Sequence, residues 1–148
     1  MNLERAIQIA VEAHAGQIDK ANEPYILHPL RVMFGVKGDE ARIVAVLHDV
    51  VDDCEDWTFE RLEREGFSPA IIQALESVTK RPEEENDYMG FIKRSGQNEI
   101  GRAVKISDLK DNLDMSRIPN PTERDHQRIA KYEQALANLS KDAEVSMN

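Results

Sequence analysis

The sequence contains a single cysteine, Cys54, among 148 residues. A lone cysteine excludes an internal disulfide and leaves too few thiolates for a closed structural zinc site. This cysteine usage fits a reducing compartment, so we predict a cytoplasmic protein. Cys54 lies between Asp53 and Glu55. Without positive neighbours its thiol lacks the surroundings of a reactive thiolate, and we expect Cys54 to be inert.

Basic residues are also scarce. The chain carries 19 Lys and Arg against 28 Asp and Glu, which gives a formal net charge of −9. Binding to a nucleic-acid backbone needs a basic footprint, and none stands out, so we expect no nucleic-acid partner. A small phosphorylated nucleotide is still allowed as the substrate, because a metal ion and a few side chains can meet its charge locally.

Long apolar runs and a signal-peptide pattern are absent as well, so we expect no membrane partner. The sequence has no internal repeat, no glycine-rich phosphate loop and no alternation of strands with helices. These absences argue against repeat architectures and nucleotide-binding α/β folds. They leave the oligomeric state open.

Apolar residues recur at helical spacing along most of the chain. One face of the first segment carries Leu3, Ala6, Ile7, Ala10 and Ala13. We predict an all-α fold, a single compact helical bundle over residues 1–148, with a core of about 1–140 and a short C-terminal tail. Asp39 is expected to cap a helix, and 81–86 to form an exposed loop with a solvated acidic run.

A polar pair interrupts the most apolar of these helical runs. His48 and Asp49 follow five apolar residues and precede Val50, Val51, Asp52 and Asp53. Polar groups on a buried helix are costly unless compensated, and a divalent ion compensates them economically. On one continuous helix His48 and Asp49 could reach a single ion. His28 and Asp108 are candidates for the remaining ligands. Imidazole with carboxylate suits a first-row metal that keeps open positions for water, which favours a catalytic centre.

Other interpretations of these residues stay open. A His-Asp dipeptide alone is a weak motif. Asp52 and Asp53 could cap the helix or be solvated at its end, although the helix dipole disfavours carboxylates there. Asp111 fits a solvated surface acid better than a group behind the metal ligands. His14 could line a pocket or interact with the C-terminal end of the first helix.

Several short segments follow one another in a specific order: 13–17 (AHAGQ), 23–30 (EPYILHPL), 47–53 (LHDVVDD), 78–80 (VTK) and 104–108 (VKISD), the last followed by Asn112. In this order they resemble the hydrolase domain of RelA/SpoT proteins. The closest resemblance is to the small stand-alone, MESH1-like alarmone hydrolases of the HD superfamily. It covers nearly the whole chain, to about residue 140. It implies an HD-type helical domain that removes the 3′-pyrophosphate of (p)ppGpp.

The resemblance also implies a role for each site residue. The metal, Mn²⁺ or another divalent first-row ion, would be bound by His28, His48, Asp49 and Asp108. Catalysis would depend on Asp52 and Asp53. The substrate pocket would include Lys20 and Asn112.

Two positions depart from the family pattern. Asp52 stands where the family has Glu, and its side chain is one methylene shorter. Asp19 stands where an arginine commonly lies against the guanine base, and a carboxylate cannot stack on a purine as a guanidinium does. Two other functions therefore stay open: hydrolysis of another nucleotide or phosphorylated cofactor, and a non-catalytic module that binds metal and nucleotide.

Overall fold

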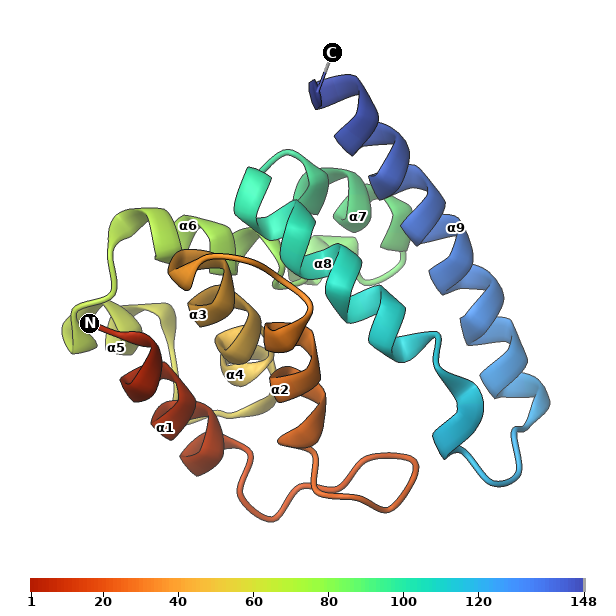
Figure 1. Ribbon diagram of the computed structural model, residues 1–148, viewed down its shortest axis with the longest axis horizontal. Helices are drawn as coiled ribbons and strands as arrows, with labels where there is room; N and C mark the ends of the chain where they lie inside the picture. Colours follow the sequence, from red (N-terminus) through yellow and green to blue (C-terminus); the bar gives the residue numbers. More distant parts are fainter. Residues whose placement is uncertain (148) are drawn as a thin grey trace.

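The computed structural model describes residues 1–147, with side chains up to residue 141, and it is helical (Figure 1). Its α-helices are α1 (Leu3–Ala13), α2 (Leu27–Phe34), α3 (Asp39–Leu47), α4 (Val50–Asp53), α5 (Phe59–Glu65), α6 (Pro69–Ser77), α7 (Tyr88–Gly96), α8 (Glu99–Asn112) and α9 (Glu123–Met147). Two short 3₁₀ helices, η1 (Pro82–Glu84) and η2 (Met115–Arg117), lie in the connections. The only β pairing among the described residues is an isolated bridge between Ile18 and Pro24, so the predicted all-α class is confirmed.

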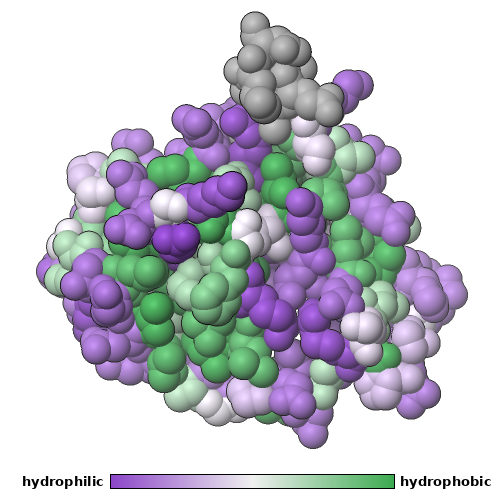
Figure 2. Space-filling view, viewed as in Figure 1, coloured by the Kyte–Doolittle hydropathy of each residue, from purple (hydrophilic) through white to green (hydrophobic). Residues whose placement is uncertain are grey.

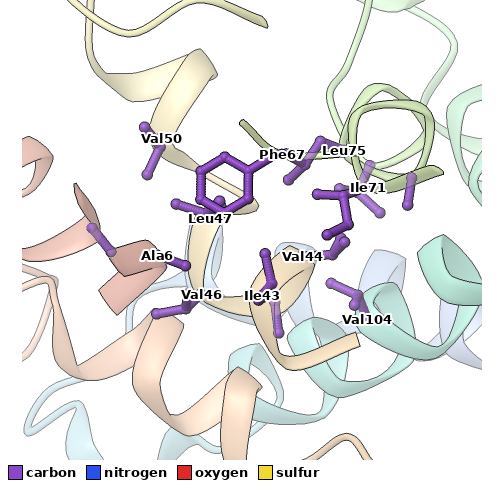
Figure 3. Close-up of a cluster of buried hydrophobic side chains, with 14 of the residues drawn as sticks. Ala6, Ile43, Val44, Val46, Leu47, Val50, Phe67, Ile71, Leu75 and Val104 are labelled. Atoms are coloured by element: carbon purple, nitrogen blue, oxygen red, sulfur yellow. The ribbon is translucent and has the colours of Figure 1, made fainter. Parts of the chain in front are cut away.

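The centre of the main core is α3. All of its residues from Ile43 to Leu47 are buried, and it packs against α1, α2, α6 and α8. A helix that is apolar on all sides can only be accommodated when neighbours surround it. Figure 3 shows the side chains that enclose it, among them Ala6, Val50, Phe67, Ile71, Leu75 and Val104. Because α3 ends at the polar pair His48-Asp49, this packing delivers both side chains to the interior.

A second apolar cluster joins α7, α8 and α9. Its buried members are Ile92, Leu109, Ala135 and Leu139. The long α9 lies along the outer side of α8 in Figure 1. Since Val104 belongs to the main core and Leu109 to the second cluster, α8 connects the two and is held on both sides.

Helix ends follow local capping signals, and the one predicted boundary, at Asp39, is wrong. Thr58 caps α5 by accepting a hydrogen bond from the Arg61 N–H, and Gly66 ends that helix in the left-handed conformation. The N-cap of α3, however, is Gly38 at φ 89°, not Asp39. Glycine tolerates this conformation at little cost, so the turn is completed one residue earlier and Asp39 becomes the first helical residue.

None of the helices in the described part of the chain is long and apolar enough to cross a membrane. The prediction of one domain with a short tail after about residue 140 stays a prediction. The backbone of α9 continues to Met147, and Asn148 lies outside the described residues.

The acidic run 83–85 is not the fully solvated loop that the sequence predicted. Glu84 is buried, and its carboxylate accepts hydrogen bonds from the Arg94 guanidinium at 2.8 Å and from the Arg81 N–H at 2.9 Å. Arg94 also donates to the Glu76 and Thr79 carbonyls at the end of α6. The ion pair therefore fixes η1 between α6 and α7.

Replacing Glu84 with glutamine should lower stability in a pH-dependent manner. The hydrogen bonds from Arg94 lower the pKa of Glu84 from 4.5 to about 2. A carboxylate whose folded-state pKa is depressed stabilises the fold above pH 4.5, and the contribution is lost as the pH falls toward 2. Urea unfolding at pH 7 should show a loss of about 1–3 kcal/mol for Glu84→Gln. The difference from wild type should shrink at acidic pH. The control is Glu83→Gln, an exposed neighbour whose replacement should change little; an equal effect of both substitutions would contradict the role of the ion pair.

Candidate metal centre

Two imidazoles and two carboxylates converge where α2, the α3–α4 junction and α8 meet. The His28 Nε2 lies 3.0 Å from the Asp108 Oδ1 and 3.7 Å from the Asp49 Oδ2. The His48 Nε2 lies 3.1 Å from the Asp49 Oδ2 and 3.5 Å from the Asp108 Oδ1. His28, His48 and Asp49 offer ligand atoms that all lie within 4.8 Å of one another. The structure thus brings together all of the predicted metal ligands.

The helix that carries two of these residues is not continuous, contrary to the prediction. α3 ends at Leu47, His48 is its C-cap, and Asp49 adopts φ −105° and ψ 0° before α4 begins. The Ala45 carbonyl accepts hydrogen bonds from both the backbone N–H and the Nδ1–H of His48. Such local side-chain bonds compete with a regular helix. The break turns the side chains of His48 and Asp49 toward one point. On a straight helix these two neighbouring side chains would point about 100° apart.

Both imidazoles are oriented by hydrogen bonds at the nitrogen that faces away from the centre. The His48 Nδ1–H donates to the Ala45 carbonyl at 2.6 Å, and the His28 Nδ1–H donates to the Asp111 Oδ2 at 2.7 Å. With the proton on Nδ1, each Nε2 presents its lone pair to the centre. The His48 Nε2 is buried and has no hydrogen-bond partner among the described atoms. An orphaned buried acceptor beside carboxylates fits a divalent cation, and so does the mixed N/O donor set.

Asp111 is the main correction to the predicted site. The sequence favoured a solvated surface acid, but the side chain is only 11% exposed and joins His28 to Arg31. Burial opposes its ionisation, yet the hydrogen bonds from His28 and Arg31 prevail and lower its pKa to about 2. A carboxylate that fixes the tautomer of a ligating histidine raises the basicity of that ligand. The sequence separation of 83 residues from His28 hid this contact.

Asp108 is held by two neighbours on α8. The Lys105 ammonium donates to its Oδ2 at 2.8 Å, and the Asn112 amide donates to its Oδ1 at 3.1 Å. Lys105 was missed by the sequence reasoning, although its i,i+3 spacing from Asp108 is a recognisable signal. Asn112, predicted to bind substrate, lines the cleft and also orients the Asp108 carboxylate.

Tyr25 is a second residue that the sequence reasoning missed. Its hydroxyl donates to the Asp49 Oδ2 at 2.5 Å. Burial and the neighbouring Asp49 carboxylate raise the pKa of Tyr25, so the phenol stays protonated as a donor. The ring also lies between His14 and His28, at centroid distances of 5.0 and 5.7 Å. Tyr25 therefore connects the Asp49 carboxylate with the end of α1.

The four groups of the centre shift one another's pKa values. Burial disfavours the ionised form of each group, but the facing carboxylates raise the pKa values of His28 and His48. The imidazoles in turn help to lower the pKa values of Asp49 and Asp108 against the effect of burial. Protons can thus occupy the place of a cation. Since ligands must lose these protons before they bind a metal, affinity should fall as the pH is lowered.

A cleft of about 560 Å³ opens above the centre. His28, Asp49 and Asp108 line it, and so do the predicted substrate residues Lys20 and Asn112. Its outer part is formed by η2 and α9, which contribute Met115, Arg117, Ile118, Arg128, Ile129 and Tyr132. A space of this size admits a nucleotide.

Asp52 and Asp53 do not line this cleft. Both are exposed on α4, one turn beyond Asp49. Burial, Asp49 and Asp52 raise the pKa of Asp53 to about 6. The structure thus leaves their predicted catalytic role untested. The raised pKa means that Asp53 can exchange a proton near neutral pH.

Asp19 lines the cleft while it holds its own loop together. Its Oδ1 accepts hydrogen bonds from the Ala21 N–H at 2.8 Å and the Glu23 N–H at 3.0 Å. Between them Asn22 adopts φ 62°, a conformation that asparagine tolerates better than most residues. Asp19 is therefore a turn-forming residue, and an arginine there would lose both bonds.

No protein-family model matches the chain. It is 32% identical over 121 residues to a guanosine-3′,5′-bis(diphosphate) 3′-pyrophosphohydrolase of Aquifex aeolicus, a match that covers 75% of this chain and 17% of the relative. It is 33% identical over 112 residues to a putative chloroplastic GTP diphosphokinase, RSH1, of Arabidopsis thaliana, covering 73% and 12%. A probable pyrophosphohydrolase of the same name in Synechocystis is 42% identical over 80 residues, covering 51% and 10%. The chain thus spans less than a fifth of the length of these relatives.

Removal of a central imidazole should cost both metal and stability. His48→Ala deletes a buried group that faces Asp49 and Asp108, and leaves their charges without a partner. Calorimetric titration should show Mn²⁺ affinity weakened more than about 100-fold, and urea unfolding a loss of about 3 kcal/mol. His126→Ala, at an exposed histidine on α9, is the matched control. Mn²⁺ binding by His48→Ala at wild-type affinity would remove His48 from the ligand set.

Substitution of the outer carboxylate tests the tautomer argument. The side chain in Asp111→Asn keeps its shape, but its NH₂ group can donate to the His28 Nδ1 and so favour a proton on Nε2. Mn²⁺ affinity should fall about 10- to 100-fold, and urea unfolding should show a loss of about 1–3 kcal/mol because the carboxylate also pairs with Arg31. Asp56→Asn, an exposed carboxylate away from the cleft, serves as the control. Equal Mn²⁺ affinity in Asp111→Asn and wild type would show that Asp111 does not orient His28.

Proposed function

The chain is a homologue of RelA/SpoT-type proteins, and from this we propose that it is an HD-type, metal-dependent phosphohydrolase that removes the 3′-pyrophosphate of (p)ppGpp. The products would be pyrophosphate and GDP or GTP. The observation that carries the proposal is the convergence of two Nδ1-protonated imidazoles with two carboxylates at the floor of a nucleotide-sized cleft. The names of the relatives support the substrate.

The residues that would hold the metal are His28, His48, Asp49 and Asp108. We favour Mn²⁺, because two imidazoles and two carboxylates suit a first-row ion that keeps water ligands. When bound, the ion supplies a water of lowered pKa and neutralises phosphoryl charge. No nucleophilic side chain is then required, which agrees with the inert surroundings of Cys54, whose thiol pKa is raised by burial.

The remaining residues of the cleft would bind and orient the nucleotide. Lys20, at the mouth, is placed to meet phosphate charge, and Asn112 holds the Asp108 carboxylate in position. Outside the cleft, on α4 beyond Asp49, Asp53 would accept and release a proton, since a pKa of about 6 lies close to working pH. Asp52 would support it from the same exposed turn of α4.

A second candidate function is hydrolysis of a different nucleotide. It is favoured by Asp19, a turn-forming carboxylate at the position where the resemblance has an arginine. A cleft without that guanidinium loses a stacking partner for guanine and gains a negative charge.

The cytoplasmic location and the assignment to the MESH1-like subfamily stay predictions from the sequence.

The deciding assay is turnover by the Mn²⁺-loaded protein against a panel of nucleotides, with identification of the products. Release of pyrophosphate from ppGpp with GDP as co-product is the expected result. Turnover of another nucleotide alone would support the second candidate. Tight metal and nucleotide binding with no turnover of any panel member would contradict both.

Within this assay, Asp53→Asn and Asp52→Asn should keep the metal and lose turnover. Loss of a group that moves protons typically costs a factor of about 10² to 10⁴ in kcat. Glu55→Gln, an exposed carboxylate just beyond α4, is the control and should keep wild-type turnover. Unchanged kcat in both Asp variants would end the proposed role of α4.

A further inference from the structure

The end of α1 carries a buried histidine that the proposed function does not use. His14 is only 2% exposed, and its Nε2 has no hydrogen-bond partner among the described atoms. Its Nδ1 lies 2.8 Å from the Gln17 Oε1. Burial lowers the pKa of His14, so the imidazole is neutral and its Nδ1–H donates to this amide oxygen. In Figure 2 the surface over α1 and α2 is largely hydrophobic, so a polar group buried here depends on the partner that Gln17 supplies.

The Gln17 side chain joins α1 to the end of α4. Since its Oε1 accepts from His14, its Nε2 is turned toward the Cys54 Sγ, at 3.8 Å. The Cys54 thiol in turn donates to the Ala13 carbonyl at 3.0 Å. Burial raises the pKa of this thiol, which therefore keeps the proton needed for that bond. The chain of contacts thus starts and finishes at the last turn of α1, with Cys54 in its middle.

α4 depends on such contacts because it is short. It has four residues, too few for a stable isolated helix, and it packs little against the other helices. Its buried residue, Val50, lies at its start, whereas Asp52 and Asp53 at its end are exposed. Among the described contacts, those of Cys54 are the only side-chain hydrogen bonds that tie the end of α4 to another part of the fold.

We infer that Gln17 is a positioning residue for α4: through Cys54 its side chain sets where Asp52 and Asp53 lie relative to the metal centre. The inference rests on the proposed function, because it concerns the two carboxylates that are assigned proton transfer there. Gln17 does not line the cleft, and its side chain bonds to His14 and Cys54, not to a metal-binding residue. Its loss should therefore slow the reaction without weakening metal or substrate binding.

The test is Gln17→Leu, which has a similar volume and removes both hydrogen bonds. The control is Gln8→Leu, at an exposed glutamine of the same helix. With Mn²⁺-loaded protein and ppGpp, kcat of Gln17→Leu should fall by a factor of about 10 to 100, because a displaced reacting group works poorly. KM and Mn²⁺ affinity should stay within about twofold of the control, since the lost contact acts on the chemical step only.

Substitutions of Cys54 separate positioning from packing. Cys54→Ser keeps a donor for the Ala13 carbonyl and an acceptor for Gln17, so its kcat should stay near that of wild type. Cys54→Ala removes both and should behave like Gln17→Leu. Because the two side chains act as one unit, the double variant should be slower than either single variant by no more than about twofold. A fall in kcat that Cys54→Ser shares with Cys54→Ala, or a matching loss of Mn²⁺ affinity in Gln17→Leu, would overturn the inference.

Amide hydrogen exchange reports on α4 without any turnover. The Asp53 N–H donates to the Asp49 carbonyl at 3.0 Å. It should exchange at least about tenfold faster in Gln17→Leu than in Gln8→Leu, while the amides of α3 stay unchanged. Equal exchange in the two variants would contradict the role of Gln17, whether or not ppGpp is hydrolysed. Faster exchange in Gln17→Leu, combined with no ppGpp turnover by wild type, would reject the proposed function and leave Gln17 as the residue that holds α4.

Discussion

The placement of two carboxylates, the partly buried Asp49 and the buried Asp108, opposite His28 and His48 is the constraint on which the rest of the structure depends. Ionised carboxylates in an interior cost several kcal/mol unless a positive charge faces them at short range. The fold meets this condition with groups from α2, the α3–α4 junction and α8. Helices that must bring these groups to one point can slide or rotate little relative to one another. The apolar packing around α3 and α8 fixes that register from both sides.

A further layer of contacts explains why the centre is ready for a cation. The Ala45 carbonyl and Asp111 each accept an Nδ1–H. Lys105 donates to the outer oxygen of Asp108, and Tyr25 donates to the Asp49 Oδ2, the oxygen that also faces His48. Each of the four side chains is thus oriented by a neighbouring group. Such support reduces the reorganisation that binding requires.

Local signals predicted the helical class and marked His48 and Asp49, whereas their convergence with His28 and Asp108 was implied by the resemblance to RelA/SpoT hydrolase domains. Polar residues inside an apolar helical run are conspicuous, and so is helical periodicity. Asp111 and Glu84 were assigned wrongly, since an acid on a helix or in an acidic run carries no local mark of burial. Their partners, His28 and Arg94, are brought to them only by the tertiary fold. The break at His48-Asp49 was also hidden, because it arises from a histidine side chain that competes for a backbone carbonyl.

The distribution of charge connects the metal centre with its surroundings. Carboxylates gather at the floor of the cleft, where a cation would balance them, and unpaired lysine and arginine side chains gather at the rim near α9. An anionic molecule could contact the positive rim directly, but at the acidic floor it would need a cation between itself and the carboxylates. The acidic net charge of the chain opposes the approach of large polyanions, while the positive charge at the rim is local.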